Sequence, residues 1–203
     1  MPFIGLTGGF GTGKTTVLKL FKNSGAYTIN ADKLVHEILK KPTIIKKLSE
    51  VLGKEILIKK ASKTLINKKR MADIIFNTPQ KRMAVEKIIH PEVIKTAKNI
   101  KAKTLSKEPE KIIIFEVPLL FEAGYENIFD NVIVVYCSKA KAIERIEKSG
   151  FSKKQALKRI TVQMPISRKK AQADFLINNN VDIDALKPKV QAILIKIKNM
   201  IKK

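Results

Sequence analysis

The chain has 203 residues, of which 44% are hydrophobic, and this suits one compact domain rather than a disordered chain. Its formal net charge is +23, from 41 basic and 18 acidic residues, which would suit a polyanionic ligand. Only five of the basic residues are arginine and the lysines are scattered, so we interpret the charge mainly as a solvated surface and expect no specific nucleic acid partner.

No apolar run approaches the roughly 18 residues of a membrane span, so we expect no membrane contact. The first residues lack the basic and long apolar regions of a signal peptide. The single cysteine, Cys137, allows no intramolecular disulfide. Together these observations predict a cytoplasmic protein.

Apolar runs in chain order predict strands at 2–7, 26–30, 111–117, 130–137 and 174–178. Helical spacing predicts helices at 14–21, 32–41, 138–150 and 152–164, and a closing helix with Val190, Leu194, Ile197 and Ile201 on one face. The stretch 43–104 is expected to be mostly helical, with interruptions at Gly53, Pro79 and Pro91.

Strands that alternate with helices, and that are apolar without a break, are typical of a parallel sheet covered on both faces. The fold class predicted is therefore α/β, a parallel sheet flanked by helices. The helical stretch between the second and third strands is too long for a simple crossover, so we interpret it as an inserted subdomain. The basic helices near 140–163 suggest a second, smaller insertion.

Residues 8–15, GGFGTGKT, match the pattern G-x-x-x-x-G-K-[ST] at every defined position, between an expected strand and an expected helix. Glycines let the backbone N–H groups close around phosphate, and the helix N-terminus favours negative charge. Lys14 can reach the β and γ phosphates, and the Thr15 hydroxyl can bind Mg²⁺. The residues predicted to bind ATP in this P-loop are Gly8, Gly9, Gly11, Thr12, Gly13, Lys14, Thr15 and Thr16.

A P-loop alone leaves several classes open, including switch GTPases, motor proteins and small-molecule kinases. The chain has no N-K-x-D motif for reading guanine, which argues against a GTPase. Its short length and early P-loop favour a small kinase of a nucleotide or metabolite.

Five segments resemble the dephospho-CoA kinase family: IGLTGGFGTGKTTV, INADKLVHEIL, IIFNTPQKRMAVEKIIHPEVI, FEVPLLFEAG and RITVQMPISRKKAQADFLINNN. The resemblance implies ATP-dependent phosphorylation of the ribose 3′-hydroxyl of dephospho-CoA, with Mg²⁺ as cofactor. It also implies a P-loop kinase core at 1–31, 105–138 and 170–203, a helical CoA-binding insertion at about 32–104 and a small lid at about 139–169. We expect a monomer or a small homo-oligomer.

Asp32 is the candidate general base, because it follows an expected strand end, where ligands of such sheets bind. The family usually has a further aspartate two residues earlier, where this chain has Asn30. The alternative role of Asp32 is a helix cap.

Glu116, at the end of another expected strand, is the candidate carboxylate for the Mg²⁺ water shell, although the family more often has aspartate there. The alternative is a charged strand end beside a loop lysine. Leu119 is expected to shape the acceptor pocket, with core packing as its alternative. The resemblance makes Arg145 a lid arginine for the ATP phosphates, and a surface salt bridge with Glu144 is its alternative role.

Lys68 and Arg82 are candidate contacts for the phosphates of the acceptor, and His90 lies in the expected CoA-binding region. A structural role at a helix entry is the alternative for His90. The resemblance places Asn179 in a turn near the adenine, where a plain turn is the alternative. Two other functions stay open at this point: a kinase of a nucleoside monophosphate or another metabolite, and a P-loop NTPase that binds nucleic acid.

Overall fold

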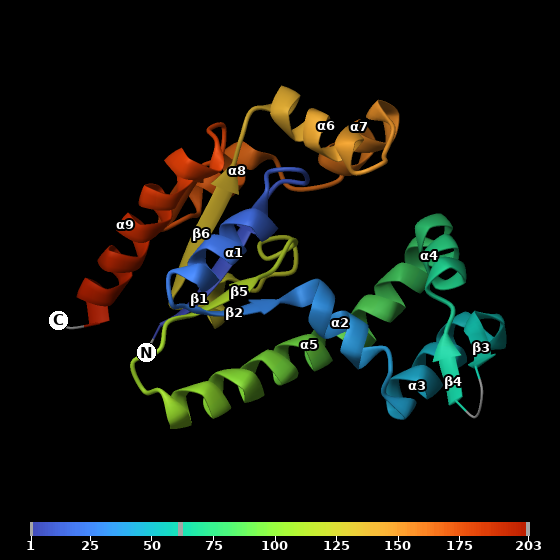
Figure 1. Cartoon of the computed structure of the whole chain (residues 1–203). Coiled ribbons are helices and arrows are strands. Elements are labelled where there is room, and N and C mark those ends of the chain that lie inside the picture. Colours follow the sequence, from blue (N-terminus) through green and yellow to red (C-terminus); the bar gives the residue numbers. More distant parts are fainter. Residues whose placement is uncertain (1, 61–62, 202–203) are drawn as a thin grey trace. The chain divides into compact units, whose positions relative to one another are not determined.

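The computed structural model describes residues 2–60 and 63–201 and contains two compact units (Figure 1). The first comprises Met1–Asn30 with Lys101–Lys203, and the second comprises Ala31–Ile100.

The first unit is built on a five-stranded sheet in the order β2-β5-β1-β6-β7. Its strands are β1 (Phe3–Gly8), β2 (Tyr27–Asn30), β5 (Ile113–Glu116), β6 (Asn131–Tyr136) and β7 (Phe175–Asn178). Every neighbouring pair is parallel, which confirms the predicted sheet. Because β1 lies in the centre and the chain passes to both sides of it, the loop after β1 is placed at the crevice where such sheets bind ligands.

Helices cover both faces of this sheet. They are α1 (Lys14–Asn23), α8 (Ile166–Ala171), α9 (Ile183–Ile201) and the last turns of α5 (Pro79–Lys107). Helices α6 (Lys139–Lys148) and α7 (Lys153–Thr161) pack against each other beyond the carboxyl end of β6 (Figure 1), and a 3-10 turn, η2 (Glu126–Ile128), precedes β6. Two of the helices have serine caps: Ser138 accepts from Lys141 N–H at the start of α6, and Ser152 forms a capping box with Gln155 at the start of α7. Helix α8 was not predicted from the sequence.

One face of the sheet packs against α1 and α9 in a single apolar cluster that includes Val17, Phe21, Val190 and Leu194. Ile197 of the expected apolar face of α9 is also buried, whereas the side chain of Ile201 lies outside the described part. On the sheet, Phe3 lies against the rings of Phe115 and Phe129, with centroids 6.1 and 5.0 Å away. The sheet is thus a rigid base for the loops at the carboxyl ends of its strands.

The second unit contains α2 (Ala31–Ile38), α3 (Pro42–Leu52), η1 (Lys54–Ile56), β3 (Leu57–Lys60), β4 (Lys63–Ile66), α4 (Lys68–Asn77) and the first part of α5. The prediction of a mostly helical stretch is wrong at the antiparallel hairpin of β3 and β4. Residues 57–66 contain too few apolar side chains to distinguish the period of 2 of a strand from the period of 3.6 of a helix.

Pro91 was expected to interrupt a helix, and this prediction is also wrong, because α5 continues through it. Proline removes one helical N–H donor, but a helix anchored by tertiary packing tolerates this loss. Buried Val85, Ile89 and Val93 lie on either side of Pro91 and provide that packing. Among residues 2–60 and 63–201, none of the helices combines the length and apolar composition that a bilayer span requires.

Candidate functional site

The P-loop leaves the central strand β1 and ends at the first turn of α1 (Figure 1). Gly11 and Gly13 have positive φ angles of 77° and 83°, which favour glycine. A Cβ on Gly13 would lie 2.3 Å from Asn179 Nδ2, so the tight approach of the 175–180 region also requires a bare backbone. The loop therefore has the shape for which its glycines were predicted.

Lys14 is buried and folds back over its own loop. Its Nζ donates to the carbonyl oxygen of Gly9 at 2.9 Å and to that of Gly8 at 3.3 Å. The ammonium group is thereby held against the backbone of the loop, next to the N-terminus of α1. A phosphate there would meet both the lysine charge and the positive end of the helix.

Thr15 and Asn30 both contact the buried carboxylate of Glu116, which is 3% exposed. The Thr15 hydroxyl donates to Glu116 Oε1 at 3.0 Å, and Asn30 Nδ2 donates to Glu116 Oε2 at 2.6 Å. The parallel register of β2 and β5 places Asn30 directly beside Glu116. Because the Thr15 proton points to the carboxylate, the lone pairs of its oxygen are free for a cation.

The described residues contain no group of three or more His, Cys, Asp or Glu side chains that could hold a metal. A hydroxyl and one carboxylate nevertheless fit Mg²⁺, which keeps several waters and takes further oxygen ligands from the phosphates of a nucleotide. Thr15 and Glu116 therefore fit an Mg²⁺ ion that would be bound together with a nucleotide.

Arg145 and Asn179 meet at the carbonyl oxygen of Thr12 in the P-loop. Asn179 Nδ2 donates to this oxygen at 2.7 Å and Arg145 Nη1 at 3.4 Å, while Arg145 Nη2 donates to Asn179 O at 3.0 Å. Glu144, the alternative partner considered for Arg145, pairs with Lys148 at 2.6 Å. The guanidinium thus lies beside the loop, as a phosphate contact requires.

Cys137 follows β6 close to these cations. Partial burial raises the pKa of its thiol, while the nearby charges of Arg145, Lys141 and Lys14 oppose the rise. The Cys137 thiol is therefore expected to stay protonated at neutral pH, as a partly buried cysteine without a nucleophilic role does.

The remaining candidates lie on other parts of the chain. In the second unit, Asp32 is exposed in the first turn of α2, and His90 is half-buried within α5. Lys68 Nζ contacts His36 Nδ1, and Arg82 Nε lies 3.9 Å from Glu86 Oε1. In the first unit, Leu119 is 40% exposed in the loop after β5. Within the first unit, the structure therefore brings together Lys14, Thr15, Glu116, Arg145 and Asn179.

Two residues that the sequence analysis did not assign contact the P-loop and the loop after β5. Gln163 accepts a hydrogen bond from the P-loop residue Phe10, and Lys169 is fully buried beside Glu122. Both lie within a segment that carried the family resemblance. No spacing or composition signal distinguished them from ordinary surface residues.

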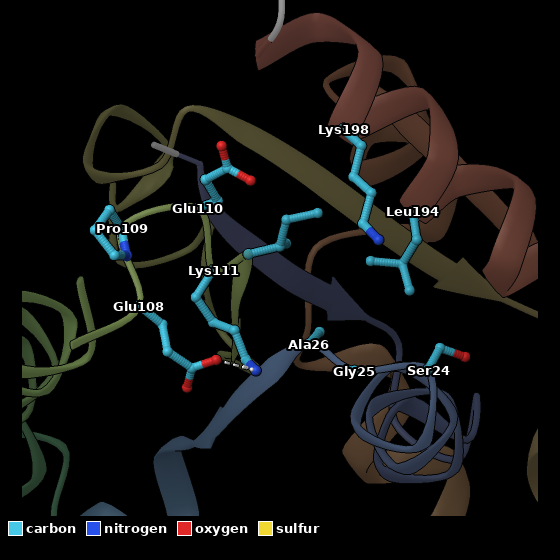
Figure 2. Close-up of a pocket in the computed structure, with 10 residues that line it drawn as sticks. Ser24, Gly25, Ala26, Glu108, Pro109, Glu110, Lys111, Leu194 and Lys198 are labelled. Carbon is cyan, nitrogen blue, oxygen red and sulfur yellow. Dashed lines mark hydrogen bonds and ion pairs between the residues drawn. The ribbon is translucent and has the colours of Figure 1, made fainter.

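A separate cavity of about 400 Å³ lies in the first unit (Figure 2). It is lined by Ser24, Gly25, Ala26, Glu108, Pro109, Glu110, Lys111, Ile112, Leu194 and Lys198. Ala26 and Ile112 precede β2 and β5, so this cavity is at the amino ends of the strands. The P-loop, Asn30 and Glu116 lie at the carboxyl ends, and the cavity is therefore distinct from the candidate site.

The family model for dephospho-CoA kinase matches residues 2–185. The chain belongs to the dephospho-CoA kinase family. It is accordingly an ATP-dependent kinase that phosphorylates dephospho-CoA, a reaction of coenzyme A biosynthesis. The P-loop and the Thr15–Glu116 pair both lie within the residues that this family model matches.

Relatives and solved structures agree with this membership. A dephospho-CoA kinase of Carboxydothermus hydrogenoformans is 34% identical over 96% of this chain and 93% of its own length. One of Aquifex aeolicus is 35% identical, over 91% of each chain.

The crystal structure of TT1252 from Thermus thermophilus is similar with a TM-score of 0.78, 26% identity, and 95% and 96% coverage of the two chains. The dephospho-CoA kinase from Campylobacter jejuni has a TM-score of 0.69 at 26% identity, with 97% and 96% coverage. Shikimate kinase from Acinetobacter baumannii, 16% identical with a TM-score of 0.53 over 97% and 93%, shares the fold alone. These matches confirm the predicted fold class.

Proposed function

We propose that residues 8–16 bind ATP with Mg²⁺, and that the γ-phosphoryl group passes to the ribose 3′-hydroxyl of dephospho-CoA. The observation that carries this proposal is the hydrogen bond between Thr15 and the buried Glu116 at the end of the P-loop. A hydroxyl with free lone pairs beside a carboxylate is what a kinase presents to a nucleotide-bound cation.

Thr15 and Glu116 would hold Mg²⁺, directly or through water. When bound, the ion neutralises charge on the phosphates during transfer. Lys14 and Arg145 add positive charge from two sides of the same loop, and Asn179 holds the backbone between them. Preorganised charges of this kind stabilise the transferring phosphoryl group without having to move during the reaction.

Asp32 is proposed as the general base for the acceptor hydroxyl. It is exposed, and only one residue separates it along the chain from Asn30, which contacts Glu116. Residues 32–104 would bind dephospho-CoA through Lys68, Arg82 and His90, with Leu119 contributing from the loop after β5. Residues 139–169 would act as the lid that excludes water, which limits wasteful hydrolysis of ATP.

Replacing Asp32 with Asn tests the base. We expect kcat to fall by about 10²–10⁴-fold, because an amide cannot accept the proton, while the Kd for ATP stays unchanged. The measurement is steady-state phosphorylation of dephospho-CoA together with calorimetric ATP binding.

Asp73→Asn is the matched control, because Asp73 is also an exposed helical aspartate of the second unit, and it should leave kcat unchanged. Turnover near the wild-type rate in Asp32→Asn would show that Asp32 only stabilises the N-terminus of α2.

The cytoplasmic location and the monomeric or small oligomeric state remain predictions. Light scattering of the purified chain measures the oligomeric state directly. The predicted lid and insertion boundaries likewise remain proposals, which limited proteolysis with and without substrates would test.

A further inference from the structure

The tip of the P-loop, Phe10, is held from a distant part of the chain. Its backbone N–H donates to Gln163 Oε1 at 2.8 Å, across 153 positions of sequence. Its ring lies edge-on to Phe151 at 6.0 Å, and the guanidinium of Arg159 lies 5.2 Å from the Phe10 ring and 4.4 Å from the Phe151 ring. The loop tip is thus contacted on both its backbone and its side chain.

Gln163 begins a segment, residues 163–169, that is anchored on its other side to the loop after β5. Met164 N–H donates to Glu122 Oε1 at 2.9 Å. Lys169 Nζ pairs with Glu122 Oε1 at 2.8 Å and donates to Pro118 O at 3.3 Å. Three contacts therefore fix this anchoring segment to residues 118–122.

Lys169 is 0% exposed, whereas the side chain of its partner Glu122 is 21% exposed. A lysine is almost never fully buried unless it is paired, because its charge loses the solvation of water. The ion pair therefore constrains where the anchoring segment can lie, since any displacement would separate Lys169 from its compensating charge.

We propose that Gln163 is a positioning residue for the P-loop and that the Lys169–Glu122 pair holds Gln163 in place. The inference rests on the proposed function, because it takes residues 8–16 as the ATP site. A loop whose tip is already fixed loses less conformational freedom when its N–H groups close on phosphate, and so binds ATP more tightly. Gln163 acts on ATP through the loop and need not touch the nucleotide.

The first experiment replaces Gln163 with Met, which has similar length but no oxygen acceptor. We expect the calorimetric Kd for ATP, measured without acceptor, to rise about tenfold, because the Phe10 N–H loses its partner. The KM for dephospho-CoA should stay within about twofold of the wild-type value. Gln172→Met, at an exposed glutamine just after α8, is the control and should leave both values unchanged.

The second experiment tests the anchor with Lys169→Met and with a double variant that combines Lys169→Met and Gln163→Met. If Lys169 holds Gln163, Lys169→Met also weakens ATP binding, and the double variant is no weaker than Lys169→Met alone. Additive effects would overturn the anchoring role. Glu122→Gln, which removes only the partner's charge, replaces Lys169→Met if that variant does not fold.

Lys14→Met distinguishes an error in the proposed ATP site from an error in the positioning role of Gln163. If Lys14→Met binds ATP like the wild type, the proposed ATP site is wrong. If Lys14→Met loses ATP binding while Gln163→Met binds ATP normally, the ATP site stands and the positioning role of Gln163 is wrong.

Discussion

The P-loop region and the second unit hold their candidate residues in different ways. Around the P-loop, Glu116, Asn179 and Lys14 are buried and bonded to partners that include residues more than 100 positions away. In the second unit, Lys68 and Arg82 make contacts on the surface, and Arg82 is paired within one helix turn.

The two regions differ in how firmly their contacts fix a side chain. Buried, long-range hydrogen bonds exist only when the whole unit is folded, and they fix a side chain in one geometry. Exposed charged pairs are screened by water and fix little. The proposed nucleotide half of the site is therefore preorganised, whereas the proposed acceptor contacts lie at the surface, where water screens them.

The largest effect is expected for Lys14→Met, at the centre of the preorganised region. Loss of the ammonium group above the P-loop should lower kcat/KM by about 10²–10³-fold, as removal of a charge that stabilises a transition state does. The measurement is coupled detection of ADP release. Lys19→Met, on the exposed side of α1, should retain wild-type kcat/KM. Wild-type activity in Lys14→Met would show that the preorganised site around Lys14 does not take part in phosphoryl transfer.

Glu116→Gln should act through the metal. Because the amide carries no charge and Thr15 loses its carboxylate acceptor, the concentration of Mg²⁺ needed for half-maximal rate should rise about tenfold or more. Spin-resonance measurement of Mn²⁺ binding in the presence of ADP gives the same comparison without turnover. Glu110→Gln, at an exposed residue beside the separate cavity, is the control. An unchanged metal requirement would contradict the assignment of Glu116.

Lys169→Met and Lys187→Met compare a buried ion pair with an exposed one. We expect Lys169→Met to lower the free energy of unfolding by about 2–3 kcal/mol, because Glu122 loses its partner but stays partly in water. Lys187 pairs with Asp184 at 2.8 Å on the surface, and its replacement should leave the melting temperature unchanged. Thermal unfolding measures both. Equal effects of the two substitutions would show that burial of Lys169 does not stabilise the fold.

The smallest catalytic effects are expected for Lys68→Ala and Arg82→Ala. Each should raise the KM for dephospho-CoA about two- to fivefold and leave kcat and the KM for ATP unchanged, because exposed charges contribute modestly to binding. The effects should weaken at high salt. No change in KM for dephospho-CoA at low salt would remove these residues from the acceptor site.

Much of the fold followed from local patterns. The apolar runs at 111–117 and 130–137 predicted β5 and β6, and alternation with helices predicted a parallel sheet, because a strand buried on both faces needs apolar residues throughout. The hairpin of β3 and β4 was missed, because its short strands carry several lysines and fit two periodicities. Pro91 was misread, because packing of the flanking residues of α5 outweighs the loss of one donor.

The sequence by itself determined the P-loop, its lysine and its threonine, because their spacing follows from local backbone geometry around phosphate. The tertiary structure alone decided that Glu116 accepts from Thr15 and Asn30, that Asn179 and Arg145 share the Thr12 carbonyl, and that Lys169 is buried. Those contacts join residues that are far apart along the chain. Their geometry depends on strand order and helix packing, which no local spacing encodes.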